Sequence, residues 1–270
     1  MKRILIAGAD SYIGMSVERY LSQWPESYRM DTLDMQDDSW RDADFSVYDV
    51  VFQVAGIAHV RETEKIAPLY DQVNRDLAVE SARKAKAAGV GQFIFLSSMS
   101  VYGVDEGPVE PTRTPCPKSH YGKSKYQGEM EIIPLRDENF AVAVIRPPLV
   151  YGPGCKGNYR TLEKIAGLVP VFADYKNVRS MLSIDNLAAF IQQMVDTRGD
   201  GLFCPQDPEY VCTCQMIREI AAQRGKKLPL LKILNPAVLL VKKFTGMGRK
   251  AFSDLYYVRT EGNEEKKGEA

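Results

Sequence analysis

The chain has 270 residues, 45% hydrophobic and 26% charged, a composition typical of a globular protein large enough to bury a substantial core. Its 35 lysines and arginines balance 35 aspartates and glutamates, so no basic surplus indicates nucleic acid or a membrane as a partner. Five cysteines, two histidines and no secretory leader predict free thiols, a cytoplasmic location and no metal site.

Strand-like and helix-like segments alternate along the first two-thirds of the chain. Apolar runs predict strands over residues 2–8, 28–34, 48–56, 92–98 and 141–147. Helical spacing of apolar residues predicts helices over residues 12–24, 70–89 and 121–133. This alternation predicts an α/β fold with a Rossmann-type, doubly wound parallel sheet. The connection between the second and third strands is too short for another helix and strand, so we expect the sheet to be trimmed at that edge.

The regular alternation loosens after residue 151. We expect a turn-rich loop over residues 151–158, a helix over 160–168, a strand running into a helix over 178–195, and a strand over 201–205 that returns to the sheet. The predicted organisation is a dinucleotide-binding domain over residues 1–155, a smaller and partly interleaved substrate lobe over 156–260, and a disordered tail over 261–270.

The most apolar late stretch covers residues 228–244. Lys232, Asn235 and Pro236 interrupt it, and it is too short to span a bilayer. We expect a buried helix of the smaller lobe, and the alternative is a helix on a membrane surface.

The turn after the first strand resembles a phosphate-binding loop. Gly8 and Gly14 occupy two of its three glycine positions, and Ser11 replaces the middle one. On its own this pattern also suits an ordinary strand-to-helix turn. In a dinucleotide-binding loop the pyrophosphate would lie at the helix N-terminus, beside the amides of Tyr12 and Ile13. The Ser11 hydroxyl would then be able to donate to a phosphate oxygen.

An acidic residue after the second strand would hold the adenosine ribose and favour NAD over NADP. Asp34 is the first candidate and Asp31 the second, although either could simply begin a polar connection. Arg29 is the alternative that would instead face a 2′-phosphate.

Tyr121 and Lys125 are four residues apart at the start of a helix, so their side chains point off the same face. Lowering a phenol pKa from about 10 to about 7 requires roughly 4 kcal/mol, which an ammonium about 4 Å away supplies at an effective dielectric near 20. The pair can therefore serve as a general acid and base. A run of serines ends the strand at residues 92–98, where a hydroxyl can bond a substrate oxygen. Each motif alone is also compatible with a surface helix or an ordinary strand end.

Taken together and in order, these motifs resemble the extended short-chain dehydrogenases/reductases, most of all nucleotide-sugar 4-epimerases of the UDP-glucose 4-epimerase type. The resemblance covers roughly residues 1–190 and includes "GADSYIG", "FLSSMSVYG", "SHYGKSK", "VIRPPLVYGPG" and "VRSMLSIDNLA". It implies Ser98, Tyr121 and Lys125 as catalytic residues, with Ser97 and Ser100 as alternative hydroxyls. It implies cofactor contacts at Gly8, Ser11, Tyr12, Ile13, Gly14, Asp31, Asp34, Val54, Ala55, Gly56, Asn74, Tyr121, Lys125 and Pro148. It implies substrate contacts at Ser98, Asn158 and Arg179.

The expected activity is NAD-dependent 4-epimerisation of a nucleotide-activated hexose, with UDP as the expected nucleotide, through a 4-keto intermediate. The alternatives are an NAD(P)H-dependent reductase or dehydrogenase and a non-catalytic dinucleotide-binding sensor. A 4,6-dehydratase is disfavoured because Met99 and Ser100 stand where those relatives carry an acidic pair. We also expect a homodimer without nucleic acid or membrane partners. His59 and His120 could border the site, although a structural role is favoured for His59.

Overall fold

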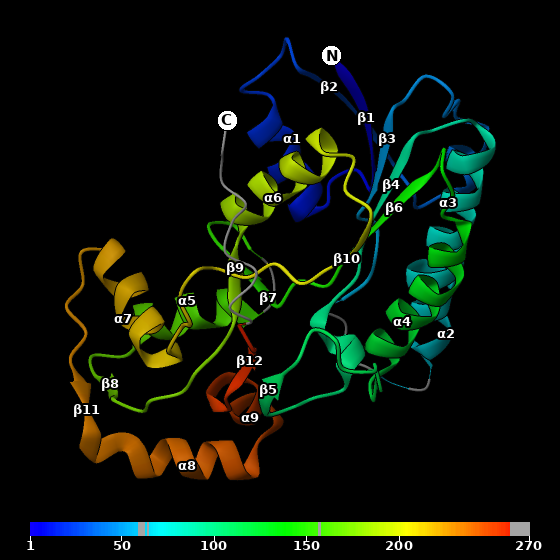
Figure 1. Cartoon of the computed structure of the whole chain (residues 1–270). Helices are drawn as coiled ribbons and strands as arrows, with labels where there is room; N and C mark the ends of the chain where they lie inside the picture. The colour runs from blue at the N-terminus through cyan, green and yellow to red at the C-terminus, as the bar shows by residue number, and fades with distance from the viewer. Residues whose placement is uncertain (59–62, 64, 156–157, 260–270) are drawn as a thin grey trace.

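A computed structural model describes residues 1–58, 63, 65–155 and 158–259 (Figure 1). The predictions for His59 and for a tail over 261–270 fall outside the described residues.

A six-stranded sheet forms the centre of the molecule. Its order is β10-β6-β4-β3-β1-β2, and every pairing is parallel. The strands are β1 (Lys2–Ala7), β2 (Tyr28–Leu33), β3 (Val50–Gln53), β4 (Gln92–Leu96), β6 (Ala141–Ile145) and β10 (Gly201–Phe203). The chain moves from β1 to β2 on one side and then returns to β3 on the other. A doubly wound sheet of this kind forms its ligand crevice where the winding reverses, here between β1 and β3.

The predicted Rossmann-type fold class is therefore confirmed, including the trimmed edge at β2. The connection from β2 to β3 contains only the short helix η1 (Asp38–Asp42).

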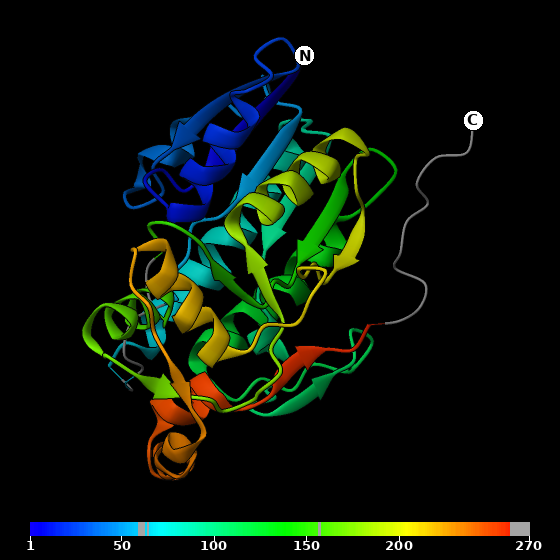
Figure 2. The ribbon, with the colours of Figure 1, turned by 90° about the vertical axis from the view of Figure 1, so that its left-hand side faces the viewer.

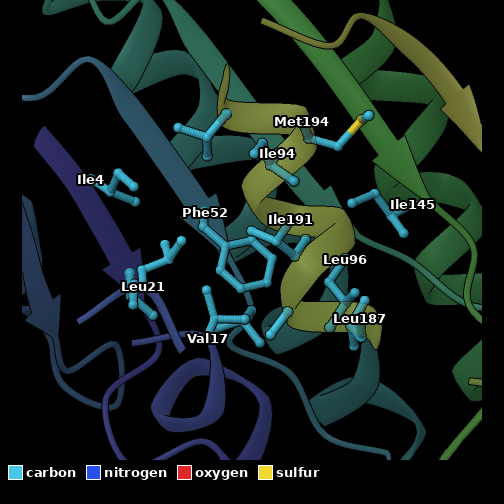
Figure 3. Packing of buried hydrophobic residues seen from close by; sticks show 14 of the residues in the cluster. Ile4, Val17, Leu21, Phe52, Ile94, Leu96, Ile145, Leu187, Ile191 and Met194 are labelled. Atoms are coloured by element: carbon cyan, nitrogen blue, oxygen red, sulfur yellow. The ribbon is translucent and has the colours of Figure 1, made fainter. Parts of the chain in front are cut away.

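Helices cover both faces of the sheet (Figures 1 and 2). On one face, Ile4 and Ile6 of β1 pack with α1 (Tyr12–Leu21) and α6 (Ile184–Asp196), and Figure 3 shows this cluster. On the other face, Leu5 and Ala7 pack in a cluster with α3 (Leu77–Ala87) and the end of α4 (His120–Ile132). Because side chains alternate between faces and both faces are covered, the strands read as nearly continuous apolar runs.

Two further segments precede α3 and bear on the site. They are the short helix α2 (Ala67–Tyr70) and a π-helix, η2 (Asp71–Asp76). Short helices η3 (Met99–Tyr102) and η4 (Ile133–Leu135) follow β4 and α4.

The remaining elements form a smaller layer beside the carboxyl edge of the sheet. β7 (Leu149–Tyr151) pairs with β9 (Met181–Ser183), and α5 (Asn158–Leu168) packs with α7 (Thr213–Gln223). β8 (Phe172–Ala173) pairs with β11 (Leu230–Leu231), and β5 (Gly107–Val109) pairs with β12 (Leu255–Tyr257). Because α6 and β10 return to the main sheet, the two parts are interleaved. A domain boundary at residue 155 stays a prediction.

The last helices are η5 (Lys232–Leu234), α8 (Asn235–Phe244) and α9 (Gly246–Phe252). The prediction of a buried helix here was wrong, because Val238 is the one buried residue among the described side chains of α8. The helix lies at the outer edge of the smaller layer and is covered from one side (Figure 1). Apolar composition does not reveal whether another element reaches the second side. Among the described helices, none is both long and apolar enough to cross a membrane.

Candidate active site

The turn between β1 and α1 is closely packed against the segment after β3. Gly8 has φ +132°, and a Cβ there would lie 2.7 Å from the backbone nitrogen of Ala55. A Cβ on Gly14 would lie 3.0 Å from Ile6 Cγ2, so this glycine lets α1 approach β1. These are the roles of the first and third glycines in a dinucleotide-binding turn.

Ser11 occupies the middle position as the N-cap of α1. Its Oγ accepts a hydrogen bond from the Gly14 amide at 3.0 Å. The amides of Tyr12 and Ile13 have no hydrogen-bond partner among the described residues. Two free amides at a helix N-terminus suit a phosphate group, as the sequence predicted, while capping by Ser11 was not foreseen.

The segment after β3 lies against the glycine turn, on the other side of the point where the winding reverses. The amides of Val54 and Ala55 donate to the Ala7 carbonyl at 3.0 and 2.8 Å. A Cβ on Gly56 would lie 2.9 Å from Asn74 Oδ1 and 3.2 Å from Lys125 Nζ. Gly8 and Gly56 therefore allow the glycine turn, the segment after β3 and α4 to pack closely together.

Asn74 fixes the segment after β3 from within the π-helix. Its Oδ1 accepts the Ile57 amide at 2.9 Å, and its Nδ2 donates to the Ile57 carbonyl at 3.0 Å and to Ser124 Oγ at 3.2 Å. π-Turns occur frequently at functional sites. Asn74 therefore joins the segment after β3 to α4.

The two acidic candidates on β2 have different surroundings. Asp34 follows the strand directly, and the amides of Gly8 and Ala9 donate to the neighbouring Leu33 carbonyl at 2.9 and 3.0 Å. The Asp34 carboxylate is exposed and accepts the Gln36 amide at 3.0 Å. Asp31 lies within the strand, 3.9 Å from the Arg3 guanidinium.

Asp34 therefore lies at the carboxyl edge, beside the glycine turn. Arg29 lies further back on the same strand, opposite Arg3 of β1.

Ser98 and Tyr121 come together from β4 and α4. Ser98 follows β4 and caps η3, accepting the Ser100 amide at 3.1 Å. Ser119 caps α4 by accepting the Gly122 amide at 3.0 Å, which places Tyr121 in the first turn of that helix. A side-chain hydrogen bond links Ser98 to the Tyr121 phenol.

The pKa of Tyr121 is raised by burial, and the hydrogen bond with Ser98 opposes that rise. Lys125 is buried, and burial lowers its pKa to about 8, with the nearby Glu129 carboxylate opposing the shift. Lys125 Nζ donates to the Leu96 carbonyl at 2.9 Å and lies 4.9 Å from the centre of the Phe95 ring.

The structure shows no effect of Lys125 on the pKa of Tyr121, so the lowering of the phenol pKa by Lys125 stays a prediction. Desolvation acts more strongly on the phenol than any neighbouring charge, and the ammonium is directed to a backbone carbonyl.

Beneath these residues lies an ion pair that the sequence reasoning missed. Arg146, just after β6, places Nε 3.0 Å from Glu129 Oε1 and donates from Nη1 to the Tyr102 hydroxyl at 2.9 Å. Ser97 is buried and donates to the Glu129 carboxylate, so this alternative hydroxyl belongs to the core network. Glu129 follows Lys125 by four residues, and that spacing is the signal that could have revealed it.

The other alternative hydroxyl, Ser100, is exposed, with its Oγ 3.2 Å from Ser98 Oγ. Pro148 is buried after β6, and His120 begins α4 half-buried. The Tyr12 hydroxyl donates to the Pro153 carbonyl at 3.2 Å, which connects the glycine turn to the loop after β7.

The two proposed diphosphate contacts lie in the smaller layer. Asn158 is the first residue of α5. Arg179 lies just before β9, is 8% exposed, and donates from Nη1 to the Ser253 carbonyl at 3.0 Å. Burial lowers the pKa of Arg179. Its guanidinium is therefore held under the segment that leads into β12.

Comparisons with known proteins agree with this geometry. A model of the NAD dependent epimerase/dehydratase family matches residues 4–201. The UDP-glucose 4-epimerase of Vibrio cholerae is 35% identical over 190 residues, covering 66% of this chain and 57% of that protein. A second relative is the N-acetyl-alpha-D-glucosaminyl-diphospho-ditrans,octacis-undecaprenol 4-epimerase of Escherichia coli O157:H7. It is 28% identical over 221 residues, covering 77% of this chain and 64% of that protein. The chain thus matches less than two-thirds of the length of each of these relatives.

Among solved structures, a dTDP-4-dehydrorhamnose reductase ortholog from Clostridium acetobutylicum superposes with a TM-score of 0.71. Its sequence is 20% identical, and the superposition covers 95% of this chain and 90% of that structure. Epimerases and reductases therefore share this fold.

Proposed function

Because the chain belongs to the NAD dependent epimerase/dehydratase family, we propose that it catalyses NAD-dependent 4-epimerisation of a nucleotide-activated hexose, with UDP as the nucleotide. The observation that carries this proposal is the hydrogen bond between Ser98 and the phenol of Tyr121, with buried Lys125 one turn further along α4. Tyr121 would accept the proton, Ser98 would donate to the reacting oxygen, and Lys125 would supply a cation.

Residues around the crevice between β1 and β3 would hold the dinucleotide. The free amides of Tyr12 and Ile13 would bind the pyrophosphate, and Asp34 would accept hydrogen bonds from the adenosine ribose. An exposed carboxylate at that place also repels a 2′-phosphate, which favours NAD over NADP. The nicotinamide ring supplies reversible hydride exchange with C4 of the sugar when it is bound.

In the proposed reaction, Tyr121 as phenolate accepts the proton of the sugar 4-hydroxyl as C4 loses hydride. The product of this half-reaction is a 4-keto sugar, and Tyr121 returns the proton when hydride is restored to the opposite face. The Ser98 hydroxyl stabilises the phenolate before the proton is transferred, and it would donate to the oxygen of the 4-keto sugar afterwards. Lys125 contributes the cation on the same helical face. Arg179 and Asn158 are the proposed contacts of the diphosphate.

A second candidate keeps the chemistry and changes the carrier of the sugar. The E. coli relative is named for a substrate on a diphospho-undecaprenol carrier, and helix α8 of this chain exposes apolar side chains. Both carriers present a diphosphate next to the sugar, so the proposed roles of Tyr121 and Ser98 are the same.

Assembly and location complete the proposal. We place a homodimer interface on α3 and α4, where Met130 is exposed, and the protein in the cytoplasm.

The test is incubation of the purified chain with NAD and a panel of UDP-hexoses, followed by separation of the sugar epimers. We expect a 4-epimer without net change in NADH absorbance, and loss of that product in Tyr121→Phe. Tyr126→Phe, on the same helix, is the matched control and should retain turnover.

Stoichiometric consumption or release of NAD(P)H would instead identify a reductase or dehydrogenase. Dinucleotide binding without turnover of any sugar would identify a sensor. Turnover restricted to prenyl-diphosphate sugars would select the second candidate.

A further inference from the structure

Helix α8 exposes several large apolar side chains. The α8 face consists of Ile233, just before the helix, with Leu239, Leu240, Val241 and Phe244. Ile233 is 83% exposed, Leu240 58% and Phe244 72%. Leu240 and Phe244 are four residues apart on one side of the helix, whereas Val238 is buried in a cluster with Phe252 of α9. The helix is therefore anchored through Val238, and its exposed surface carries apolar side chains with Lys243 among them.

The stretch of chain that carries this face is basic in sequence. Residues 224–253 contain eight lysines and arginines and no aspartate or glutamate, in a chain whose opposite charges balance at 35 each. Five of these cations are exposed and form no ion pair within the described part of the chain: Lys227, Lys232, Lys243, Arg249 and Lys250. Net neutrality of the whole chain therefore hides a basic segment, in which Arg224 and Lys242 pair with Glu163 and Glu106 and these five exposed cations do not.

We propose that helix α8 docks on the surface of an anionic lipid bilayer, with the α8 face at the acyl boundary and the surrounding cations on the lipid headgroups. This goes beyond the proposed reaction and holds for either sugar carrier. A helix with an apolar face and lysines beside it lies in the plane of an interface rather than across it. Ten residues rise only about 15 Å, roughly half the thickness of the hydrocarbon core.

The charge pattern selects a lipid surface over a second copy of this chain. A symmetric pairing of two α8 faces would bring the same cations together, and like charges across an interface disfavour association. An anionic headgroup layer instead meets each exposed Lys or Arg with an opposite charge. The expectation of no membrane partner relied on the overall charge balance, which does not describe this region.

The test is flotation of the full chain with vesicles of phosphatidylcholine alone and of phosphatidylcholine with phosphatidylglycerol. We expect binding to the anionic vesicles, weakened at 0.5 M salt because exposed charges are screened. Leu240→Ser/Phe244→Ser should reduce the bound fraction at least tenfold at equal lipid. Lys243→Gln/Lys250→Gln should reduce the preference for anionic vesicles.

The matched control is Leu202→Ser/Val47→Ser, which removes two exposed apolar side chains from the sheet domain and should leave vesicle binding unchanged. Circular dichroism and thermal unfolding verify that each variant is folded.

Failure of the chain to float with anionic vesicles, or equal binding by Leu240→Ser/Phe244→Ser, would overturn the proposal. So would a concentration-dependent dimer that this double variant abolishes, since the α8 face would then bind a second copy. None of these measurements depends on sugar turnover.

Discussion

Replacing Lys125 by methionine should remove the activity without destabilising the protein at neutral pH. Lys125 is 4% exposed, and burial lowers its pKa from 10.5 to about 8. A shift of about 2.5 units corresponds to about 3 kcal/mol by which folding disfavours the protonated side chain. Methionine has a similar length and carries no charge, so it avoids this cost.

Methionine also loses the hydrogen bond from Nζ to the Leu96 carbonyl. Loss of that bond costs about 1–3 kcal/mol. At pH 7 the two effects together predict that Lys125→Met is as stable as the wild type or up to about 2 kcal/mol more stable.

The pH dependence has a definite sign. Between pH 8 and 10.5 the unfolded chain keeps the lysine proton and the folded chain has lost it, so the contribution of Lys125 to stability rises with pH. The advantage of Lys125→Met should therefore shrink by about 2–3 kcal/mol from pH 7 to pH 10. Buried tyrosines, whose pKa values are raised, act in the opposite direction, but they are common to both proteins and cancel in the difference.

The assay is urea unfolding of both proteins at pH 7, 8.5 and 10. Lys123→Met is the matched control, because it makes the same substitution at an exposed lysine of the same helix. The reasoning would be refuted if the difference in unfolding free energy between Lys125→Met and the wild type did not change with pH. It would also be refuted if Lys125→Met lost more than about 3 kcal/mol of unfolding free energy at pH 7, because burial of the ammonium would then not be costly.

Three further outcomes are expected. Ser98→Ala should lower kcat by about one to three orders of magnitude, as for loss of one positioned catalytic hydrogen bond. Ser97→Ala should chiefly lower the unfolding midpoint, because it removes the hydrogen bond to the buried Glu129 carboxylate. The reverse result would exchange the roles of the two serines. Asp34→Asn should weaken NAD binding and narrow its advantage over NADP in titrations with both cofactors, and the same effect from Asp31→Asn instead would move the ribose contact. Arg179→Lys should raise the substrate KM at least tenfold with NAD affinity unchanged, since an ammonium cannot make two parallel bonds to a phosphate; an unchanged KM would show that its bond to Ser253 is purely structural.

The sheet could be predicted from the sequence because its strands are buried on both faces. Each apolar run had to be a buried strand or a buried helix, and its length decided between them. The exposure of α8 could not be predicted in this way, since Leu240 and Phe244 look the same in sequence whether or not another element covers them. The π-helix around Asn74 likewise depends on contacts with residues far along the chain, including Ser124.

The candidate site was predicted as a set of residues and not as an electrostatic arrangement. The motifs placed Ser98 and Tyr121 at the same edge, and the structure gives their hydrogen bond. The pKa directions could not be predicted, because they depend on how completely Tyr121 and Lys125 are desolvated. The partner of Lys125, the Leu96 carbonyl, is a backbone atom and leaves no mark in a motif.

The pairing of β12 with β5 has a consequence for the order in which the protein assembles during synthesis. Tyr257 pairs with Val109, and its hydroxyl donates to the Arg146 carbonyl at 2.8 Å, across 111 positions of the chain. Contacts this distant in sequence form only after a large entropic cost of loop closure has been met. On the ribosome, the strands up to β10 emerge and are able to pair well before residue 257 leaves the exit tunnel. The cluster of Met99, Tyr102 and Tyr257 next to Ser98 is therefore among the last parts of the protein to form. A nascent chain that already carries all the proposed catalytic side chains still lacks this support for the candidate site.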